Sequence, residues 1–435
     1  MAGAGNAIIR IPPSRTPAPV QGPANVPFSA IMQAASPLPA GTRWWILCRV
    51  VDNFGDAGVC WRLARQLAGE HDAEVTLFID RPELIARLAG TAPVRRPGEP
   101  AARLAGVRIA QWPESRPDSA DPSWPPSMAD ADRPDVVLSA FGCEPPDWIR
   151  SMLAGGPRRP LWIHLEYLSA EPWVDGCHGL SSVKPDGAVE HFFYPGFTPA
   201  SGGLLRERDA LAPAERPAAA ARAAALAQLC GHAPEPGEQV LTLFCYPDSP
   251  LDALLPALAR AERPTLLLVP EGVAPDEPES FAGCGLPPGG PAARRDRLRI
   301  ARIRFLPQDD YDALLRLADL NFVRGEDSWI RAHWARRPFV WQPYRQDEDT
   351  HHDKLEAFLA RLRAAAVAAG DPAAAIGAVE AAMRAWSGLG DAGAAWQALA
   401  AQGEAIEAVY RHWTGSLVRR PDLATQLAGF VRDRL

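Results

Sequence analysis

The stretch Val50–Val59, with the sequence VVDNFGDAGV, constrains the fold more than any other part of this 435-residue chain. It follows the apolar run Trp44–Cys48, which predicts a buried strand. It precedes a segment in which Val59, Leu63 and Leu67 recur at the spacing of a helix. A strand, a glycine-containing loop and a helix in this order place ligand-binding groups at the carboxyl end of a strand in an open α/β sheet. We therefore expect the chemistry of this protein at this loop.

Two carboxylates, Asp52 and Asp56, lie four residues apart in the loop, together with Gly55 and Gly58. Glycine lets the backbone turn tightly and lets a substrate approach closely. One explanation for the acids is helix capping, because aspartate is favoured at helix N-termini. For two acids beside two glycines, a functional role for at least one is the better explanation, and such a carboxylate could act as a general base.

Composition excludes several classes of protein. The formal net charge is −7, from 45 basic and 52 acidic residues, which gives no reason to expect a nucleic-acid partner. No apolar run approaches the ~20 residues of a membrane span, and no signal peptide is visible, so we expect a cytoplasmic protein without a membrane partner. The seven cysteines are scattered and none has C-x-x-C spacing. We expect buried, reduced thiols rather than zinc sites or disulfides.

Strand-like apolar runs alternate with helical segments in two successive series along the chain, which predicts an α/β fold with two Rossmann-like domains facing a central cleft. The expected divisions are a disordered leader at 1–42, an N-terminal Rossmann-like domain at 43–230, a second Rossmann-like domain at 238–402, and C-terminal helices at 403–435 that could pack back on the first domain.

Two segments break this alternation. Residues 113–133 are rich in Pro, Ser and Asp and predict a surface insertion. Residues 169–205 show no regular period, and an irregular segment of that length is usually functional or a crossing between domains.

A second candidate loop, Arg324–Ser328 (RGEDS), again lies between a predicted strand and a predicted helix. A helix N-terminus with a glycine before it and Ser and Arg beside it favours anion binding. The negative charges of its two acids would repel a phosphate. We therefore infer that backbone N–H groups and Ser328 face a diphosphate, while Glu326 faces sugar hydroxyls. The alternative is a simple capping cluster.

The run Gln346–Asp353 (QDEDTHHD) contains metal-type ligands. A hard-cation site is one interpretation, and a solvated loop that caps the following helix is the favoured one. The isolated His164 and His191 are interpreted as structural. The sequence has no G-x-S-x-G, P-loop or H-E-x-x-H motif, which excludes the commonest hydrolases, NTPases and metalloproteases.

Taken together, these motifs resemble those of the elongation factor P arginine rhamnosyltransferase family (EarP). The resemblance is carried by VDNFGDAGVCWRLARQL at 51–67, LEYLSAE at 165–171, GCHGL at 176–180, PGFTP at 195–199, RGEDS at 324–328 and QDED at 346–349. It implies an inverting glycosyltransferase of the GT-B type. The implied donor is dTDP-β-L-rhamnose, the implied acceptor is an arginine of elongation factor P, and neither a metal nor another cofactor is implied.

The resemblance also implies roles for single residues. Asp56 matches the general base of the family, while Asp52 and Glu326 match two further essential acids. The residues implied to bind dTDP-rhamnose are Asn53, Phe54, Gly55, Phe197, Phe305, Gln308, Tyr311, Arg324, Glu326, Asp327 and Ser328.

Two other functions stay open at this point. One is a GT-B transferase with a glycan or lipid acceptor, which an apolar or basic surface stretch in the first domain would favour, and none is visible. The other is a non-catalytic module that binds a nucleotide sugar. The presence of Asp52, Asp56 and Glu326 opposes it, because a binding module needs no candidate base.

Overall fold

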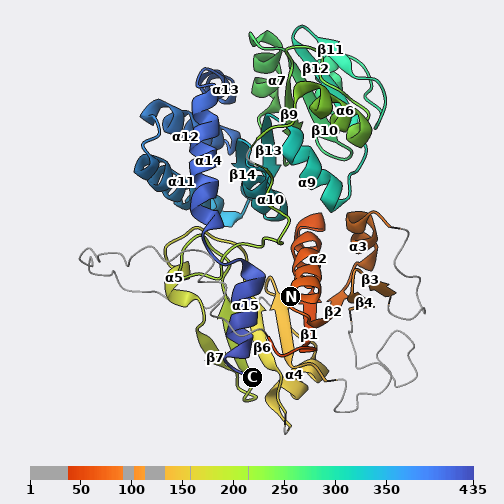
Figure 1. Ribbon diagram of the computed structural model, residues 1–435, viewed down its shortest axis with the longest axis vertical. Helices are drawn as coiled ribbons and strands as arrows, with labels where there is room; N and C mark the ends of the chain where they lie inside the picture. Colours follow the sequence, from red (N-terminus) through yellow and green to blue (C-terminus); the bar gives the residue numbers. More distant parts are fainter. Residues whose placement is uncertain (1–37, 92–101, 113–132, 157, 214) are drawn as a thin grey trace. The chain divides into compact units, whose positions relative to one another are not determined.

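Two β-sheets organise the chain (Figure 1). The computed structural model describes residues 38–91, 102–112, 133–156, 158–213 and 215–435. In the described part the first sheet has the order β3-β4-β2-β1-β5-β6-β8-β7, and only the edge strands β3 and β7 are antiparallel to their neighbours. Its strands are β1 (Arg43–Cys48), β2 (Glu74–Ile79), β3 (Ala102–Leu104), β4 (Val107–Gln111), β5 (Val136–Ala140), β6 (Leu161–Leu165), β7 (Ser181–Val183) and β8 (Val189–Phe193).

The second sheet has the order β11-β12-β10-β9-β13-β14, and its edge strand β11 is antiparallel to β12. The predicted α/β class with two Rossmann-like sheets is confirmed. Nearly all central strand residues are buried, as expected where helices cover both faces of a parallel sheet. The strands are β9 (Gln239–Leu243), β10 (Thr265–Pro270), β11 (Ala293–Arg295), β12 (Leu298–Ile303), β13 (Leu320–Arg324) and β14 (Phe339–Gln342).

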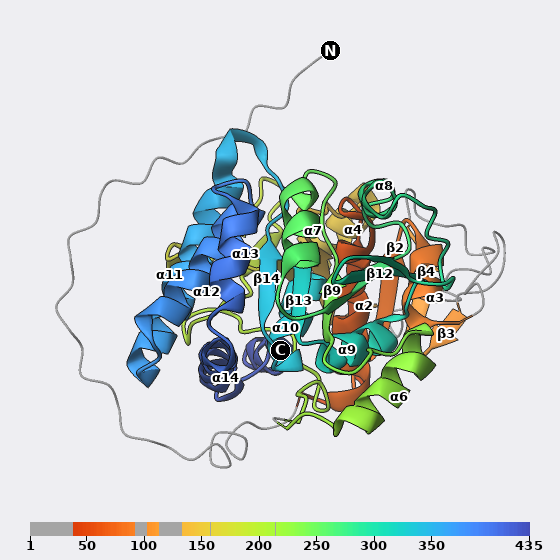
Figure 2. The ribbon, with the colours of Figure 1, turned by 90° about the horizontal axis from the view of Figure 1, so that it is seen from above.

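The helices alternate with these strands and then continue to the C-terminus (Figure 2). In the first series they are α2 (Asn53–Glu70), α3 (Pro82–Ala89), α4 (Asp147–Ala154) and α5 (Val174–Cys177). The second series contains α6 (Ala219–Cys230), α7 (Leu251–Arg260), α8 (Glu277–Ala282), α9 (Gln308–Leu317) and α10 (Asp327–Ala335). The last helices are α11 (Thr350–Ala369), α12 (Ala373–Trp386), α13 (Ala392–Ala400), α14 (Glu404–Val418) and α15 (Leu423–Arg432).

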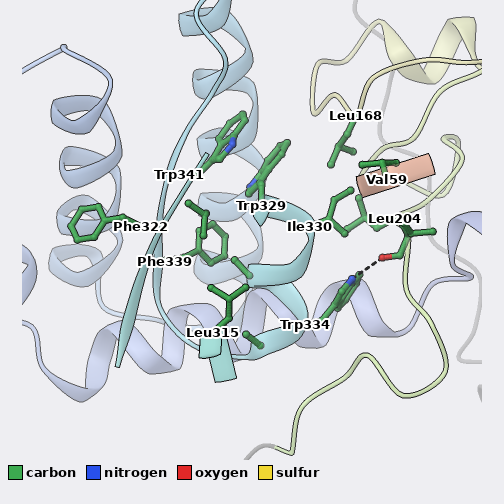
Figure 3. Packing of buried hydrophobic residues seen from close by; sticks show 14 of the residues in the cluster. Val59, Leu168, Leu204, Leu315, Phe322, Trp329, Ile330, Trp334, Phe339 and Trp341 are labelled. Carbon is green, nitrogen blue, oxygen red and sulfur yellow. Dashed lines mark hydrogen bonds between the residues drawn. The ribbon is translucent and has the colours of Figure 1, made fainter. Parts of the chain in front are cut away.

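Helix α10 lies at the centre of the hydrophobic core (Figure 3). Every residue from Ser328 to Ala335 is buried. The indole of Trp329 stacks on Trp341 of β14 at 3.6 Å between ring centroids, and Trp334 donates its Nε1–H to the carbonyl of Leu205 at 2.8 Å. This packing fixes the start of α10, and with it the loop that precedes the helix.

The last helix, α15, lies against α2, the first helix in the described part of the chain. Gln66 of α2 donates to the carboxylate of Asp422 at 3.1 Å, and the N–H of Leu423 donates to the carbonyl of Leu204 at 2.9 Å. The domain boundaries given above stay predictions.

The segment 169–205 is more regular than predicted. Strand β8 pairs in parallel with β6, and β7 pairs with β8 in a hairpin. The sequence Lys184-Pro185-Asp186-Gly187 makes its turn, with Gly187 at φ +85° and the Lys184 N–H bonded to the Ala188 carbonyl at 2.8 Å. A Pro-Asp-Gly sequence is a recognised turn signal, so this hairpin was predictable.

Several other predictions fall at the limits of the description. Residues 1–37 and 113–132 lie outside the described residues. Leu38 is buried and the N–H of Gly41 donates to the backbone carbonyl of Asp72, so the last residues of the predicted leader are packed rather than disordered. All seven cysteines are described and are free thiols, but Cys177 is half-buried and Cys284 is exposed, so the prediction of buried thiols is wrong for these two. In the described part of the chain, no helix combines the length and apolar character that a bilayer crossing requires.

Candidate active site

Two cavities adjoin at the predicted loops. The larger, of about 290 Å³, is walled by the two loops, α3, and the ends of β9, β10 and β12. The smaller, of about 230 Å³, opens toward β5, β6 and β14. Four residues line both cavities, namely Asp52, Gly55, Gly325 and Glu326. The two loops singled out in the sequence therefore form the wall that the cavities share.

Asp56 has two oxygens in different environments. Oδ2 accepts hydrogen bonds from the backbone N–H groups of Val51 at 2.8 Å and Asp52 at 2.9 Å, so it closes the N-terminus of α2. Oδ1 accepts from the hydroxyl of Tyr167 at 3.3 Å. The Asp56 side chain is only 2% exposed and borders the smaller cavity. Capping thus explains one oxygen of Asp56, and the other contacts Tyr167, a second lining residue of the smaller cavity.

Asp52 occupies the N-cap position of α2, yet its side chain makes no capping hydrogen bond within the described chain. Burial raises the pKa of this carboxyl; Arg324 opposes the shift and Asp56 adds to it. A Cβ on Gly325 would lie 3.2 Å from Asp52 Oδ2, and Gly325 has a φ of +59°. Glycine is needed at this position both for its backbone conformation and for the close approach of the two loops.

Glu326 is the acid that the second sheet contributes. Its Oε2 accepts from the N–H of Leu168 at 3.0 Å, while Oε1 has no hydrogen-bond partner among the described residues. Burial raises the pKa of Glu326 to about 8, the Leu168 N–H lowers it, and the nearby Asp56 raises it further. Glu326 is therefore largely protonated near neutral pH, with one oxygen available to a ligand.

The larger cavity is aromatic and basic at its far end. The rings of Phe54 and Phe305 lie 5.2 Å apart, and the guanidinium of Arg87 lies 4.4 Å above the ring of Phe305. Arg324 lies 4.5 Å above the ring of Phe244. Phe54, Phe305 and Arg324 were predicted here. Arg87 and Phe244 were missed, since a basic residue in the last turn of a helix such as α3 is explained equally well by the helix dipole.

Four more predicted residues border the same cavity. Gln308 donates to the carbonyl of Gly58 at 3.1 Å, and the ring of Tyr311 lies 5.8 Å from the ring of Phe244. Asp327 accepts from Gln308 at 3.4 Å. The hydroxyl of Ser328 accepts from the N–H of Arg324 at 3.0 Å and donates to its carbonyl, so Ser328 stabilises the loop itself. Its contact with a diphosphate stays a prediction.

Phe197 is not at this site. Its ring is 3% exposed and packs against Trp329, Phe358 and Trp413 in the core, at centroid distances of 5.2 to 5.8 Å. Neither cavity includes it among its described walls. The prediction that the Phe197 side chain binds the donor is corrected here, because a ring surrounded by aromatic side chains gains more from burial than from an open pocket. The structure describes the backbone of Asn53 at the start of α2, and a role for its side chain stays a prediction.

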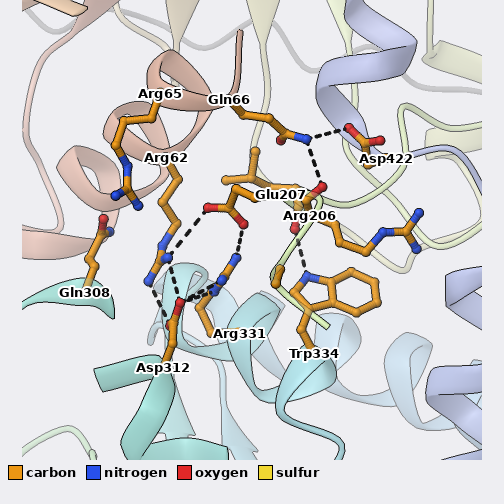
Figure 4. A network of polar contacts seen from close by, with 12 residues as sticks. Arg62, Arg65, Gln66, Arg206, Glu207, Gln308, Asp312, Arg331, Trp334 and Asp422 are labelled. Carbon is orange, nitrogen blue, oxygen red and sulfur yellow. Dashed lines mark hydrogen bonds and ion pairs between the residues drawn. The ribbon is translucent and has the colours of Figure 1, made fainter. Parts of the chain in front are cut away.

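A buried polar network lies directly behind the site (Figure 4). Arg62 of α2 is fully buried and donates two hydrogen bonds to Asp312 of α9, at 2.9 and 3.0 Å. Its Nε donates to Asp327 at 2.8 Å. Arg331 of α10 also binds Asp312, and it pairs with Glu207. The network joins the helix that carries Asp56 to the two helices that border the larger cavity.

The run Gln346–Asp353 holds one group that could bind a cation. Ligand atoms of Asp349, His351 and His352 lie within 4.8 Å of one another. Asp349 is exposed, and it forms the N-cap of α11. The predicted capping loop is wrong in form, because Asp347–Asp349 form a short 3₁₀ turn, α11 begins at Thr350, and the Asp349 side chain makes no capping hydrogen bond within the described chain.

Two mostly parallel α/β sheets, with loops that share one pair of adjoining cavities, are the architecture of GT-B glycosyltransferases. A solved structure of this fold, described as the structural basis for EarP-mediated arginine glycosylation of translation elongation factor EF-P, superposes with a TM-score of 0.59 at 31% identity. It covers 90% of this chain and 99% of its own.

The family model described as "Elongation-Factor P (EF-P) rhamnosyltransferase EarP" matches residues 44–432, and the chain belongs to this family. A protein-arginine rhamnosyltransferase of Pseudomonas aeruginosa is 41% identical over 397 residues, covering 90% of this chain and 99% of the relative. The protein of the same name from Pseudomonas putida is 41% identical over 398 residues, with the same coverage. The protein is an enzyme.

Proposed function

We propose that this protein transfers L-rhamnose from dTDP-β-L-rhamnose to an arginine guanidinium of elongation factor P, with inversion at the anomeric carbon. One observation carries the proposal: the acids Asp52 and Glu326 line both cavities at once. A donor in the larger cavity and an acceptor in the smaller cavity would therefore meet at these two acids. The family match and the names of the relatives support rhamnose, arginine and elongation factor P as the reacting partners.

The larger cavity suits a nucleoside diphosphate. The rings of Phe54 and Phe305 offer an apolar platform for thymine. Arg87 and Arg324 supply two cations on the same cavity wall, and the backbone N–H groups at the start of α10 add partial positive charge. Since these groups are fixed before the reaction, they stabilise the negative charge that develops on the departing diphosphate.

The acids suit a guanidinium. A guanidinium stays protonated at neutral pH, because its pKa lies above ~12, and its nitrogen lone pairs are delocalised. Asp52 and Asp56 would hold it through charge-assisted hydrogen bonds and orient one nitrogen toward the sugar. A bond forms from that nitrogen to C1 while the C1–oxygen bond to dTDP breaks, and the electron pair leaves with the diphosphate. Asp56 takes the proton from nitrogen.

The remaining parts of the proposal follow from this step. Attack on the face opposite dTDP gives α-rhamnosyl-arginine. The step uses no metal ion and no other cofactor. Because elongation factor P is a translation factor, the enzyme would work in the cytoplasm.

The test uses the full-length protein with dTDP-β-L-rhamnose and unmodified elongation factor P. The acceptor should gain the mass of one rhamnosyl group on arginine, and NMR of the product should show an α linkage. Asp56→Asn should bind dTDP as tightly as wild type and lose about 10²- to 10⁴-fold in transfer rate. An unchanged acceptor mass would refute the proposed reaction, and normal transfer by the variant would refute Asp56 as the base.

A further inference from the structure

The segment that follows β6 touches the candidate acids of both loops. It is part of the LEYLSAE motif at 165–171, which the proposed reaction does not use. The hydroxyl of Tyr167 donates to Asp56 Oδ1 at 3.3 Å, and the N–H of the next residue, Leu168, donates to Glu326 Oε2 at 3.0 Å. Two successive residues thus hold one acid from the first sheet and one from the second.

Tyr167 is also half of an aromatic stack. Its ring lies 4.5 Å from the ring of Phe141, with an angle of 16° between the planes. Phe141 is 7% exposed and has a φ of +59°, a conformation that a bulky residue rarely adopts. Its N–H is bonded to the carbonyl of Leu165 at 2.8 Å, which holds it in this position. Strained backbone of this kind is concentrated at functional sites.

The smaller cavity combines aromatic faces with acids. Phe141 and Tyr167 form part of one wall, and the side chain of Tyr167 is 37% exposed. The remaining aromatic lining residues are Trp329, Trp341 and Tyr344. Its acids are Asp52, Asp56 and Glu326, and Lys354 is the single cation among the described residues that line it. Aromatic faces attract cations, and a planar guanidinium both stacks on rings and binds carboxylates.

We propose that Tyr167, supported by Phe141, is the platform on which the acceptor guanidinium stacks, and that its hydroxyl positions Asp56 for proton transfer. The inference rests on the proposed function and adds a substrate-binding residue to it. Oδ2 of Asp56 is held by two backbone N–H groups, so Oδ1 is the oxygen left for the substrate. A guanidinium on the ring of Tyr167 lies beside the donor that holds Oδ1, so one residue sets both the plane of the substrate and the orientation of the base.

Two substitutions separate these roles. Tyr167→Phe keeps the ring and removes the hydroxyl, so kcat should fall about 10-fold, since a hydrogen bond to a charged group is lost. The KM for elongation factor P should stay within twofold of wild type. Tyr167→Leu also removes the ring and should raise the KM for elongation factor P about 5- to 30-fold, as expected for a lost cation–π contact. The KM for dTDP-rhamnose should not change in either variant.

Tyr194→Phe is the matched control. Tyr194 lies outside both cavities and packs edge-on against Trp173 at 5.3 Å. This variant should therefore keep the wild-type kcat, KM for elongation factor P and KM for dTDP-rhamnose. Circular dichroism and dTDP binding establish folding. If Tyr167→Leu does not fold, Tyr167→Trp replaces it and should keep the acceptor KM near that of wild type.

The outcomes are distinguishable from failure of the proposed function. No transfer by wild type would refute both proposals. Normal transfer by wild type, with the KM for elongation factor P and kcat unchanged in the Tyr167 variants, would refute the platform alone. An equal rise in the KM for donor and acceptor would show a merely structural role and would also overturn it.

Discussion

Replacing Arg62 by methionine tests whether the buried network joins the two halves of the site. Arg62 has no exposed surface and contacts three acids: Asp312, Asp327 and Glu207. Burial lowers the pKa of its guanidinium, but the three acids outweigh burial and raise it, so the side chain stays charged. Methionine fills much of the same volume without the charge. In the variant, the buried carboxylates therefore lose the ion pairs that they make with Arg62.

The expected size of the effect follows from the loss of one member of a buried ion pair. Breaking such a pair costs about 3–5 kcal/mol, because an uncompensated buried charge is left behind. Unfolding entropy is about 2.1 cal/mol/K per residue, or about 0.8 kcal/mol/K for about 400 residues. The melting midpoint of Arg62→Met should therefore fall by about 4–6 °C.

A matched control lies one turn further along the same helix. Arg65 also pairs with an acid of α9, Asp309, at 3.2 Å, but the Asp309 side chain is 77% exposed. An exposed pair contributes about 0.2–1 kcal/mol, so Arg65→Met should lower the midpoint by about 1 °C or less. Differential scanning calorimetry at constant pH and salt measures both variants, and a third, Asp312→Asn, completes a double-mutant cycle with Arg62→Met.

Equal shifts for Arg62→Met and Arg65→Met would refute the reasoning, because burial would then make no difference to the value of the pair. In the cycle, the double variant should be less destabilised than the sum of the single variants, since Arg62 and Asp312 share an interaction. Strict additivity would show that Arg62 and Asp312 have no interaction energy.

Three further perturbations have defined outcomes. Folding raises the pKa of Glu326 from 4.5 to about 8. The contribution of Glu326 to stability is therefore present below about pH 4.5 and is lost as pH rises toward 8. In thermal unfolding between pH 5 and 9, the melting midpoint of Glu326→Gln should rise relative to that of wild type as pH rises. Gly58→Ala places a Cβ 3.0 Å from Gln308 Nε2 and should reduce the transfer rate and the stability. Gly69→Ala in the same helix is the control: its Cβ meets nothing within 4 Å among the described atoms, so it should raise the melting midpoint slightly. If thymine stacks on Phe305, Phe305→Ala should weaken dTDP binding about 5- to 100-fold in calorimetry. An unchanged affinity for dTDP would show that thymine binds elsewhere.

The parts of the site that could be predicted from the sequence are those whose signals are local. Asp52 and Asp56 follow a buried strand and begin a helix, and Arg324 to Ser328 repeat that arrangement in the second series. Parallel sheets bring the carboxyl ends of their strands to one edge, so the two loops are expected at ligand-binding positions. If two such sheets face each other, the two loops are also expected to meet at one cavity wall.

The parts that could not be predicted depend on contacts between distant residues. The partners of Arg62 lie 250 and 265 positions along the chain, so nothing near Arg62 indicates that it is buried. Tyr167 reaches Asp56 across 111 positions. Phe197 shows a different error: the family resemblance implied a donor-binding residue at this position, yet tertiary packing places its ring in the core. Local pattern identifies loops well, and it cannot identify which side of a loop a side chain faces.

The electrostatics of the site indicate which pair of substrates it fits. The N-termini of α2 and α10 meet where Asp52 approaches Gly325, and helix N-termini normally stabilise carboxylates and lower their pKa values. Here the pKa of Asp52 and that of Glu326 are raised instead, with burial as the first cause. Desolvation therefore outweighs the helix dipoles, so a cation bound in the smaller cavity would stabilise the ionised form of both acids. The larger cavity is lined by Arg87 and Arg324, whose positive charges favour an anion there. A site that requires a cation on one side of a shared wall and an anion on the other is complementary to a guanidinium and a nucleoside diphosphate bound together.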